Sequence, residues 1–360
     1  MNRPPRWLPA RWLTAMLVAP IAMSLNAQPY SAHRSSAGGI PIVQLRDEAH
    51  RTVVSIVPSI GNNAYEMLVN GKNVFWFPFD SLADFAKKPS LAANPFLSPW
   101  ANRLDEHAFY ANGKKYALNP ELGNIRLDGN KLPIHGLLMF AAEWEVVEAS
   151  ADGSSAWVTS RLDFSRFPDR MAQFPFAHTI EITYRLSAGV LEVQTRLTNQ
   201  SSDSMPVSVG YHPYFRLHDA PRDEWTVSLG AGLEWTLNDK LSPTGQTTPV
   251  SGRFDDPSSI PLRGIALDNV FGGLVRDAAG KARFAVNGKQ EQIEVLYGSN
   301  YKVAVVYAPQ GANRDFICFE PMSGVTNAFN LAHRGEYNEM AVIPSGGSWQ
   351  ESYWIRPSGF

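Results

Sequence analysis

Apolar and polar residues alternate with a period of two along much of the chain, as they do in β-strands that bury one face. The clearest example is residues 179–186, whose apolar positions are Ile180, Ile182, Tyr184 and Leu186. A turn at residues 187–189 separates this predicted strand from a second one over residues 191–197. Further apolar runs of strand length are predicted at residues 42–45, 52–57, 65–69, 74–77, 303–307 and 316–319.

Asn-Gly pairs occur between apolar-alternating segments at Asn70-Gly71, Asn112-Gly113 and Asn287-Gly288. Asn and Gly tolerate the positive φ angles that a type I′ turn needs at both central positions. We therefore predict two-residue β-hairpins at all three places. Beyond residue 27, the helical pattern is confined to residues 80–87, which have room for one or two turns.

Many strands with few helices predict an all-β protein. The number of strands favours a large antiparallel β-sandwich, with two packed sheets, over a small barrel. No break in composition divides residues 40–356, so residues 40–360 are predicted to be a single domain. Residues 28–39 are mostly small and polar and are predicted to be a flexible leader.

The first 27 residues read as a secretory signal peptide. Arg3, Arg6 and Arg11 precede an apolar run over residues 12–25, and Leu25-Asn26-Ala27 is an acceptable cleavage site. The protein is thus expected to be exported, to the periplasm or outside the cell, with an uncleaved membrane anchor as the alternative.

The net charge and the number of cysteines exclude some classes of partner and of covalent cross-link. The whole chain has a formal net charge of −2, and loss of an arginine-containing leader without acidic residues makes it more negative. This charge argues against nucleic acid and anionic membranes as partners. Cys318 is the only cysteine, so an intrachain disulfide is impossible, and we expect its side chain to lie in the core.

The segment 207–215 contains the most suggestive histidine. Its first half alternates like a strand, and Pro213, which cannot donate to a sheet ladder, then follows His212 directly. A histidine held at a strand end among aromatic residues suits a proton donor that acts on a ring-shaped, partly apolar substrate such as a sugar. The alternative is a structural histidine beside a turn.

Two further charged residues stand in apolar surroundings. Glu320 follows the apolar run 316–319, where a carboxylate is costly unless it is hydrogen-bonded or used. The alternative is a solvent-facing residue at a strand tip. Arg103 lies in an aromatic segment and is suited to hydrogen bonds with sugar hydroxyls or a carboxylate. A surface ion pair with Asp105 or Glu106 would also explain it.

His135 and Asp268 complete the candidates. Gly136 would let the backbone beside His135 approach a ligand closely, although an ordinary loop histidine is also possible. Asp268 is an acid within an apolar run and is either a ligand acceptor or a turn residue. The histidines show no metal-ligand spacing, so we expect no metal. No phosphate-binding glycine loop and no Gly-x-Ser-x-Gly nucleophile motif is present in the sequence.

Taken together, these stretches resemble the aldose 1-epimerase family, the galactose mutarotases and their relatives, from Ile42 to Ile355. The matching segments occur in the family's order. They are Ala101-Asn102-Arg103, His135-Gly136, Phe174-Pro175-Phe176, Gly210–Phe215, Leu267–Phe271, Phe319-Glu320-Pro321 with Asn327–Asn330, and Pro344–Trp349. Two features differ from the family pattern: Leu137 replaces a second glycine, and the segment 121–132 is longer than usual. Both concern the shape of the sugar pocket rather than the catalytic pair.

The resemblance implies a galactose mutarotase-like supersandwich and a cofactor-independent isomerase that interconverts the α and β anomers of a free aldose. Glu320 would be the base and His212 the acid. The residues that would hold the sugar are Asn102, Arg103, His135 and Asp268. Three alternatives stay open: a carbohydrate-binding protein without catalysis, a glycoside-cleaving enzyme that uses Glu320 and Asp268 as paired carboxylates, and a relative acting on sugar phosphates, which would need extra Arg or Lys in the pocket.

Overall fold

The computed structural model describes residues 1–3, 5 and 29–360. The prediction of a signal peptide over residues 1–27 therefore falls almost wholly outside the described residues. Among the residues described, no helix is long and apolar enough to cross a membrane.

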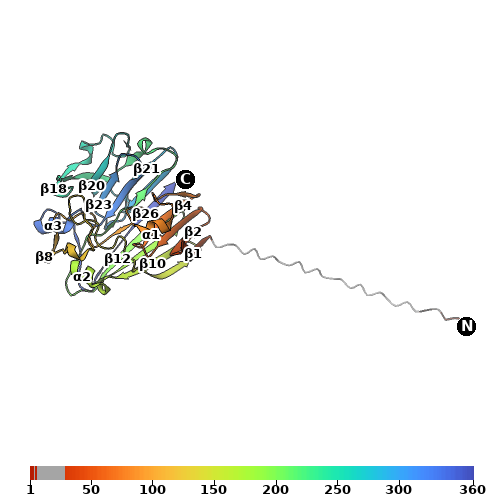
Figure 1. Ribbon diagram of the computed structural model, residues 1–360. Coiled ribbons are helices and arrows are strands. Elements are labelled where there is room, and N and C mark those ends of the chain that lie inside the picture. Colours follow the sequence, from red (N-terminus) through yellow and green to blue (C-terminus); the bar gives the residue numbers. More distant parts are fainter. Residues whose placement is uncertain (4, 6–28) are drawn as a thin grey trace.

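A nine-stranded antiparallel sheet forms one layer of the molecule (Figure 1). Its strands, in spatial order, are β19 (Ile260–Pro261), β16 (Thr226–Ser228), β21 (Ala282–Asn287), β22 (Gln292–Tyr297), β26 (Ser348–Ser358), β12 (Val190–Asn199), β11 (His178–Ser187), β10 (Ala156–Asp163) and β9 (Glu145–Ala151). Strands β11 and β12 show the predicted alternation, with every second residue buried. Their turn at Ala188-Gly189 has φ angles of 49° and 72°, as a type I′ hairpin requires.

Two further sheets face this layer. An eight-stranded sheet contains, in order, β18 (Pro243–Pro249), β17 (Ala231–Leu237), β20 (Leu267–Leu274), β23 (Val303–Ala308), β24 (Ile317–Met322), β14 (Gly210–Tyr211) and β6 (Phe96–Leu97), with β15 (Tyr214–Phe215) also paired to β24. A five-stranded sheet runs in chain order through β1 (Tyr30–Ala37), β2 (Ile40–Asp47), β3 (Thr52–Val57), β4 (Asn63–Val69) and β5 (Lys72–Asn73).

The remaining elements are short. Two small hairpin-like pairs are β7 (Ala108–Ala111) with β8 (Lys114–Ala117), and β13 (Met205–Val207) with β25 (Ala341–Ile343). The α-helices of the described residues are α1 (Leu82–Lys87), α2 (Pro168–Gln173) and α3 (Ala328–Arg334). Helix α1 lies within the stretch predicted to be helical and begins after Ser81, whose hydroxyl accepts a hydrogen bond from the backbone N–H of Asp84.

Aromatic side chains fill the space between the layers. Tyr211 of the eight-stranded sheet packs against Tyr353 of the nine-stranded sheet with ring centroids 4.9 Å apart. At the other side, a bridge between Phe75 and Phe215 joins the five-stranded sheet region to the eight-stranded sheet. One hydrophobic core cluster draws residues from all three sheets. The all-β, antiparallel sandwich architecture predicted from the sequence is confirmed.

Two local predictions were wrong. Residues 30–37 form strand β1 rather than a flexible leader, because Gly38-Gly39 makes a tight turn and pairs this small, polar segment with β2. The hairpin at Asn287-Gly288 has a four-residue loop, since Asn287 pairs with Gln292 and stays in the strand. The other two Asn-Gly pairs, at residues 70–71 and 112–113, have the positive φ angles of tight hairpins.

Candidate active site

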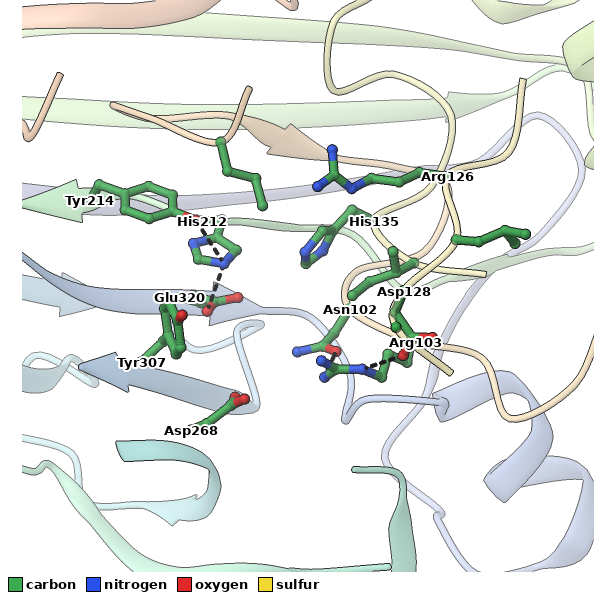
Figure 2. Close-up of a pocket in the computed structure, with 14 residues that line it drawn as sticks. Asn102, Arg103, Arg126, Asp128, His135, His212, Tyr214, Asp268, Tyr307 and Glu320 are labelled. Atoms are coloured by element: carbon green, nitrogen blue, oxygen red, sulfur yellow. Dashed lines mark hydrogen bonds and ion pairs between the residues drawn. The ribbon is translucent and has the colours of Figure 1, made fainter. Parts of the chain in front are cut away.

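A cavity of about 330 Å³ lies where loops meet the inner strands β20, β23 and β24 of the eight-stranded sheet (Figure 2). All six residues singled out in the sequence line it: Asn102, Arg103, His135, His212, Asp268 and Glu320. The other lining residues are Leu91, Arg126, Leu127, Asp128, Gly129, Ile134, Tyr214 and Tyr307. Segments far apart in the chain thus supply one polar cavity.

His212 lies between the two short strands β14 and β15 and is only 6% exposed. Its backbone N–H donates to the carbonyl of Pro95 at 3.0 Å. The ring of Tyr214 stacks on the imidazole with centroids 4.6 Å apart and planes 3° apart. Backbone and ring contacts together fix the direction of the imidazole.

Glu320 faces His212 from β24 (Figure 2). Its side chain is 1% exposed, and Oε1 lies 3.3 Å from Nε2 of His212. Within the described residues, the second oxygen, Oε2, has no hydrogen-bond partner. Strand β24 continues past Glu320 to Met322, and Pro321 lies opposite Ala304 of β23. Glu320 is therefore buried inside a sheet, not solvent-facing at a tip.

Burial sets the protonation of this pair. It raises the pKa of Glu320 well above its usual value, and the nearby carboxylate of Asp268 raises it further. Burial also lowers the pKa of His212 to about 3. Both shifts favour the uncharged form of the pair, in which the proton is on Glu320 and the imidazole is neutral. Moving that proton across the 3.3 Å contact gives the ionised form, carboxylate and imidazolium.

Arg103 is half-buried and forms neither of the ion pairs considered from the sequence. Its Nε lies 2.9 Å from Oδ2 of Asp128, and its Nη1 donates to Oδ1 of Asn102 at 3.0 Å. The two neighbouring acids bind elsewhere, Asp105 to Arg334 and Glu106 to Lys115. Arg103 is thus held at the cavity wall by partners on both sides.

His135 adopts a left-handed conformation with φ 65°, and its backbone N–H donates to the carbonyl of Asn102 at 2.8 Å. Its ring meets that of His212 edge to face, with centroids 5.3 Å apart. Burial, followed by the neighbouring His212, lowers its pKa well below the usual value. The glycine that follows serves a different purpose from the one expected: a Cβ on Gly136 would lie 2.1 Å from the carbonyl oxygen of Ser98, so it permits backbone packing rather than ligand approach.

Asp268 is part of a strand and not of a turn. It lies on β20 opposite Tyr307 of β23, and both side chains face the cavity. Burial raises the pKa of the Asp268 carboxyl, although the Arg103 guanidinium opposes this. Cys318, two residues before Glu320, is fully buried in the core, as expected.

Sequence reasoning missed four polar lining residues: Arg126, Asp128, Tyr214 and Tyr307. Tyr214 stood inside the His212 segment, and its proximity to a catalytic candidate was the available signal. Arg126 and Asp128 lie in the segment 121–132, whose unusual length was the only indication. Across residues 29–360, no group of three His, Cys, Asp or Glu side chains is arranged to hold a metal ion.

The site thus combines a buried acid–base pair with a polar cavity on an antiparallel sandwich. A family model described as aldose 1-epimerase matches residues 41–356. The chain belongs to the aldose 1-epimerase family.

Individual proteins are similar to this chain in sequence or in fold. The chain is 26% identical over 295 residues to the uncharacterized protein YphB of Escherichia coli K12, covering 78% of this chain and 90% of that protein. A galactose mutarotase-like protein from Clostridium acetobutylicum superposes with a TM-score of 0.81 at 20% identity, covering 93% of this chain and all of that one. Galactose 1-epimerase from Lactobacillus acidophilus NCFM gives a TM-score of 0.72 at 16% identity, with 93% and 100% coverage. At these identities the two structural matches establish the fold alone.

Proposed function

We propose that this protein is an aldose 1-epimerase that interconverts the α and β anomers of a free aldose. The observation that carries the proposal is the contact of 3.3 Å between Glu320 and His212 within a cavity lined by hydroxyl-binding side chains. Membership of the family supports the same reaction class.

The reaction requires two proton transfers, and this pair can supply both. In the ionised form, the Glu320 carboxylate takes the proton of the anomeric hydroxyl, and the His212 imidazolium gives one to the ring oxygen. The bond between C1 and the ring oxygen breaks and leaves an aldehyde. Rotation about C1–C2 followed by the reverse transfers closes the ring on the other face. Because both forms of the pair carry one proton, the site needs no proton from solvent to begin.

The remaining polar residues would position the sugar. Arg103, Asn102 and His135 lie on one side of the pair, and Asp268 with Tyr307 lies on another (Figure 2). Groups held in place before the substrate arrives lower the barrier without reorganisation at the moment of reaction. Several of these side chains are themselves fixed by hydrogen bonds, as Arg103 is by Asp128.

Polarimetry tests the proposal. Freshly dissolved α-anomers of D-glucose, D-galactose and D-galacturonate are followed to their final rotation with the wild-type protein, Glu320→Gln and His212→Asn. We expect acceleration by the wild type and a loss of about 10²–10⁴-fold in each variant, the usual range for one acid–base group. Circular dichroism checks that the variants fold.

Other outcomes identify other functions. Binding of these sugars without acceleration would make the protein a carbohydrate-binding member of the fold. Release of new reducing ends from glycosides would indicate hydrolysis by paired carboxylates. Near-normal rates in both folded variants would reject the assignment of Glu320 and His212.

We also propose that the reaction takes place outside the cytoplasm. The support is the arginine-containing, apolar leader over residues 1–27. Fractionation of cells that express the full chain, with N-terminal sequencing of the recovered protein, tests this; recovery from the cytoplasm with the leader intact would contradict it.

A further inference from the structure

Arg126 is a charged side chain of the cavity lining to which the proposed function above gives no role. Its side chain reaches toward His135, on the side of the catalytic pair away from Asp268 (Figure 2). Among the described residues it forms no ion pair and no side-chain hydrogen bond, and the residue is exposed. The other cavity arginine, Arg103, is already neutralised by Asp128 at 2.9 Å. Arg126 therefore presents a free guanidinium to whatever enters.

The backbone at Arg126 is firmly placed. Its carbonyl accepts a hydrogen bond from the N–H of Ile134 at 2.9 Å, and a β-bridge joins Leu127 to Pro133. Asp128 then closes the loop by accepting hydrogen bonds from the N–H groups of Asn130 and Leu132. The long segment 121–132 is thus folded into a tight loop that holds Arg126 at the cavity.

The cavity lining has one acidic and one basic side chain whose charges are not balanced by a neighbour among the described residues. The charges of Arg103 and Asp128 cancel, and the Glu320–His212 pair carries no net charge in either its uncharged or its ionised form. Of the acids and bases that line the cavity, Asp268 and Arg126 remain. They lie on opposite sides of the catalytic pair (Figure 2). A substrate with an anionic substituent at one end would be oriented by these two charges.

The position of Arg126 indicates which carbon atom of a bound sugar would lie nearest to its guanidinium. In an aldopyranose, the ring oxygen is bonded to C5, which carries C6, whereas C1 is bonded to C2. Arg126 lies on the same side of the cavity as His212, the residue proposed to protonate the ring oxygen, and away from Asp268 (Figure 2), so it lies on the side where C6 would project. One free guanidinium matches one carboxylate, with which it can form two parallel hydrogen bonds. A phosphate dianion would call for more positive charge than the lining residues offer.

We propose that the substrates of this protein are hexuronates, aldoses with a carboxylate at C6, and that Arg126 binds that carboxylate. This inference rests on the proposed epimerase function and names its substrate class. It assigns to the segment 121–132 the role of carrying the residue that determines specificity.

The test compares kcat/KM for the anomers of D-galacturonate and D-galactose, and of D-glucuronate and D-glucose, at pH 7. The proteins are the wild type, Arg126→Gln, Arg126→Lys and Arg166→Gln. Arg166 is the matched control, since it too is exposed and has no ion pair among the described residues, but it does not line the cavity. Thermal unfolding verifies that each variant folds.

We expect the wild type to prefer each uronate over its neutral counterpart by about tenfold or more, the size of a charge-assisted hydrogen bond in a partly enclosed site. Arg126→Gln should remove this preference, Arg126→Lys should retain part of it, and Arg166→Gln should match the wild type. The KM for uronates should also rise with salt, because ions screen an exposed guanidinium.

Failure of the uronate inference and failure of the epimerase proposal give different results. If the wild type accelerates the neutral hexoses as well as or better than the uronates, or if Arg126→Gln leaves the preference intact, the uronate inference is wrong and the epimerase proposal stands. If glucose 6-phosphate is preferred over both, the anion is a phosphate and the carboxylate assignment falls. If no aldose is accelerated, the epimerase proposal itself is wrong.

Discussion

The Nε of Arg103 lies 2.9 Å from Oδ2 of Asp128, and this ion pair joins two loops that the sequence separates by 25 positions. The same carboxylate holds its own loop together, because Oδ1 accepts hydrogen bonds from the N–H groups of Asn130 at 2.8 Å and Leu132 at 3.0 Å. One side chain therefore shapes the loop and orients an arginine of the candidate active site.

The substitution Asp128→Asn separates these two roles. Asp128→Asn keeps an acceptor for the two backbone N–H groups but loses the charge that holds Arg103. We expect kcat/KM to fall about tenfold to a hundredfold, the range for one charge-assisted hydrogen bond, with little change in Tm. Asp128→Ala should lower both kcat/KM and Tm. Asp152→Asn, which alters an exposed turn with the same capping bonds, is the control. Unchanged kinetics in Asp128→Asn would show that Arg103 needs no anchor.

Tyr214 should act through its ring. Its hydroxyl is 3.5 Å from Nε2 of His212, at the limit of a hydrogen bond, whereas the two rings are stacked at 4.6 Å. Tyr214→Phe keeps the stacked ring, so we expect its kcat to lie within about threefold of the wild-type value. Tyr214→Ala removes the ring that holds the imidazole in place, and we expect kcat to fall by roughly tenfold or more. Polarimetry at saturating sugar measures both. Equal losses in the two variants would instead assign the effect to the hydroxyl.

Gly136 should be essential for stability. Its φ is 66°, and a Cβ would meet the carbonyl oxygen of Ser98 at 2.1 Å. Gly136→Ala should therefore reduce the free energy of unfolding by about 3 kcal/mol or more, the backbone strain alone accounting for about 1–3. Gly113→Ala is the matched control, because Gly113 has φ 72° but open space around its Cβ position. Denaturant titration of both variants separates the cost of backbone strain from the cost of the steric overlap with Ser98. A similar loss of unfolding free energy in both variants would mean that the loop at Ser98 moves to make room for the Cβ.

His178 should make the fold sensitive to acid. It is buried between aromatic rings, and burial lowers its pKa from 6.5 to about 4. The unfolded chain therefore takes up a proton before the folded one does, so this residue's contribution is intact above pH 6.5 and is lost as the pH falls toward 4. The loss amounts to about 3 kcal/mol.

Replacement by glutamine tests this dependence. Glutamine in His178→Gln can still donate to the carbonyl of Phe176, the partner of the imidazole, but cannot become charged. The free energy of unfolding should then fall less steeply between pH 6.5 and 4 than in wild type, whatever its value at pH 7. His33→Gln, on exposed strand β1, should leave the wild-type slope unchanged. A slope in His178→Gln equal to that of wild type would contradict the prediction.

The sequence by itself determined the elements whose signals are local. Strands β11 and β12 follow directly from their period-two pattern, and the hairpins at Asn70-Gly71 and Asn112-Gly113 follow from residues that accept positive φ. Each depends on a few neighbouring residues, which is why it could be predicted. Even β1 had such a signal in Gly38-Gly39, although its small polar residues suggested a flexible leader. Five of the six candidate site residues also came from local context, strengthened by the resemblance to a family, and Asn102 came from that resemblance alone.

Only the tertiary structure decided how those residues meet. Strand β12 pairs with β26, at least 150 positions away, and pairing between strands also buries Glu320 opposite Val305, where it meets His212 from a distant segment. The partner of Arg103 is Asp128 and not a sequence neighbour, since chain folding and not spacing brings charges together. Likewise Arg126 gains its place at the cavity only when its loop closes. Contacts between distant segments depend on the packing of whole sheets, and no local pattern encodes them.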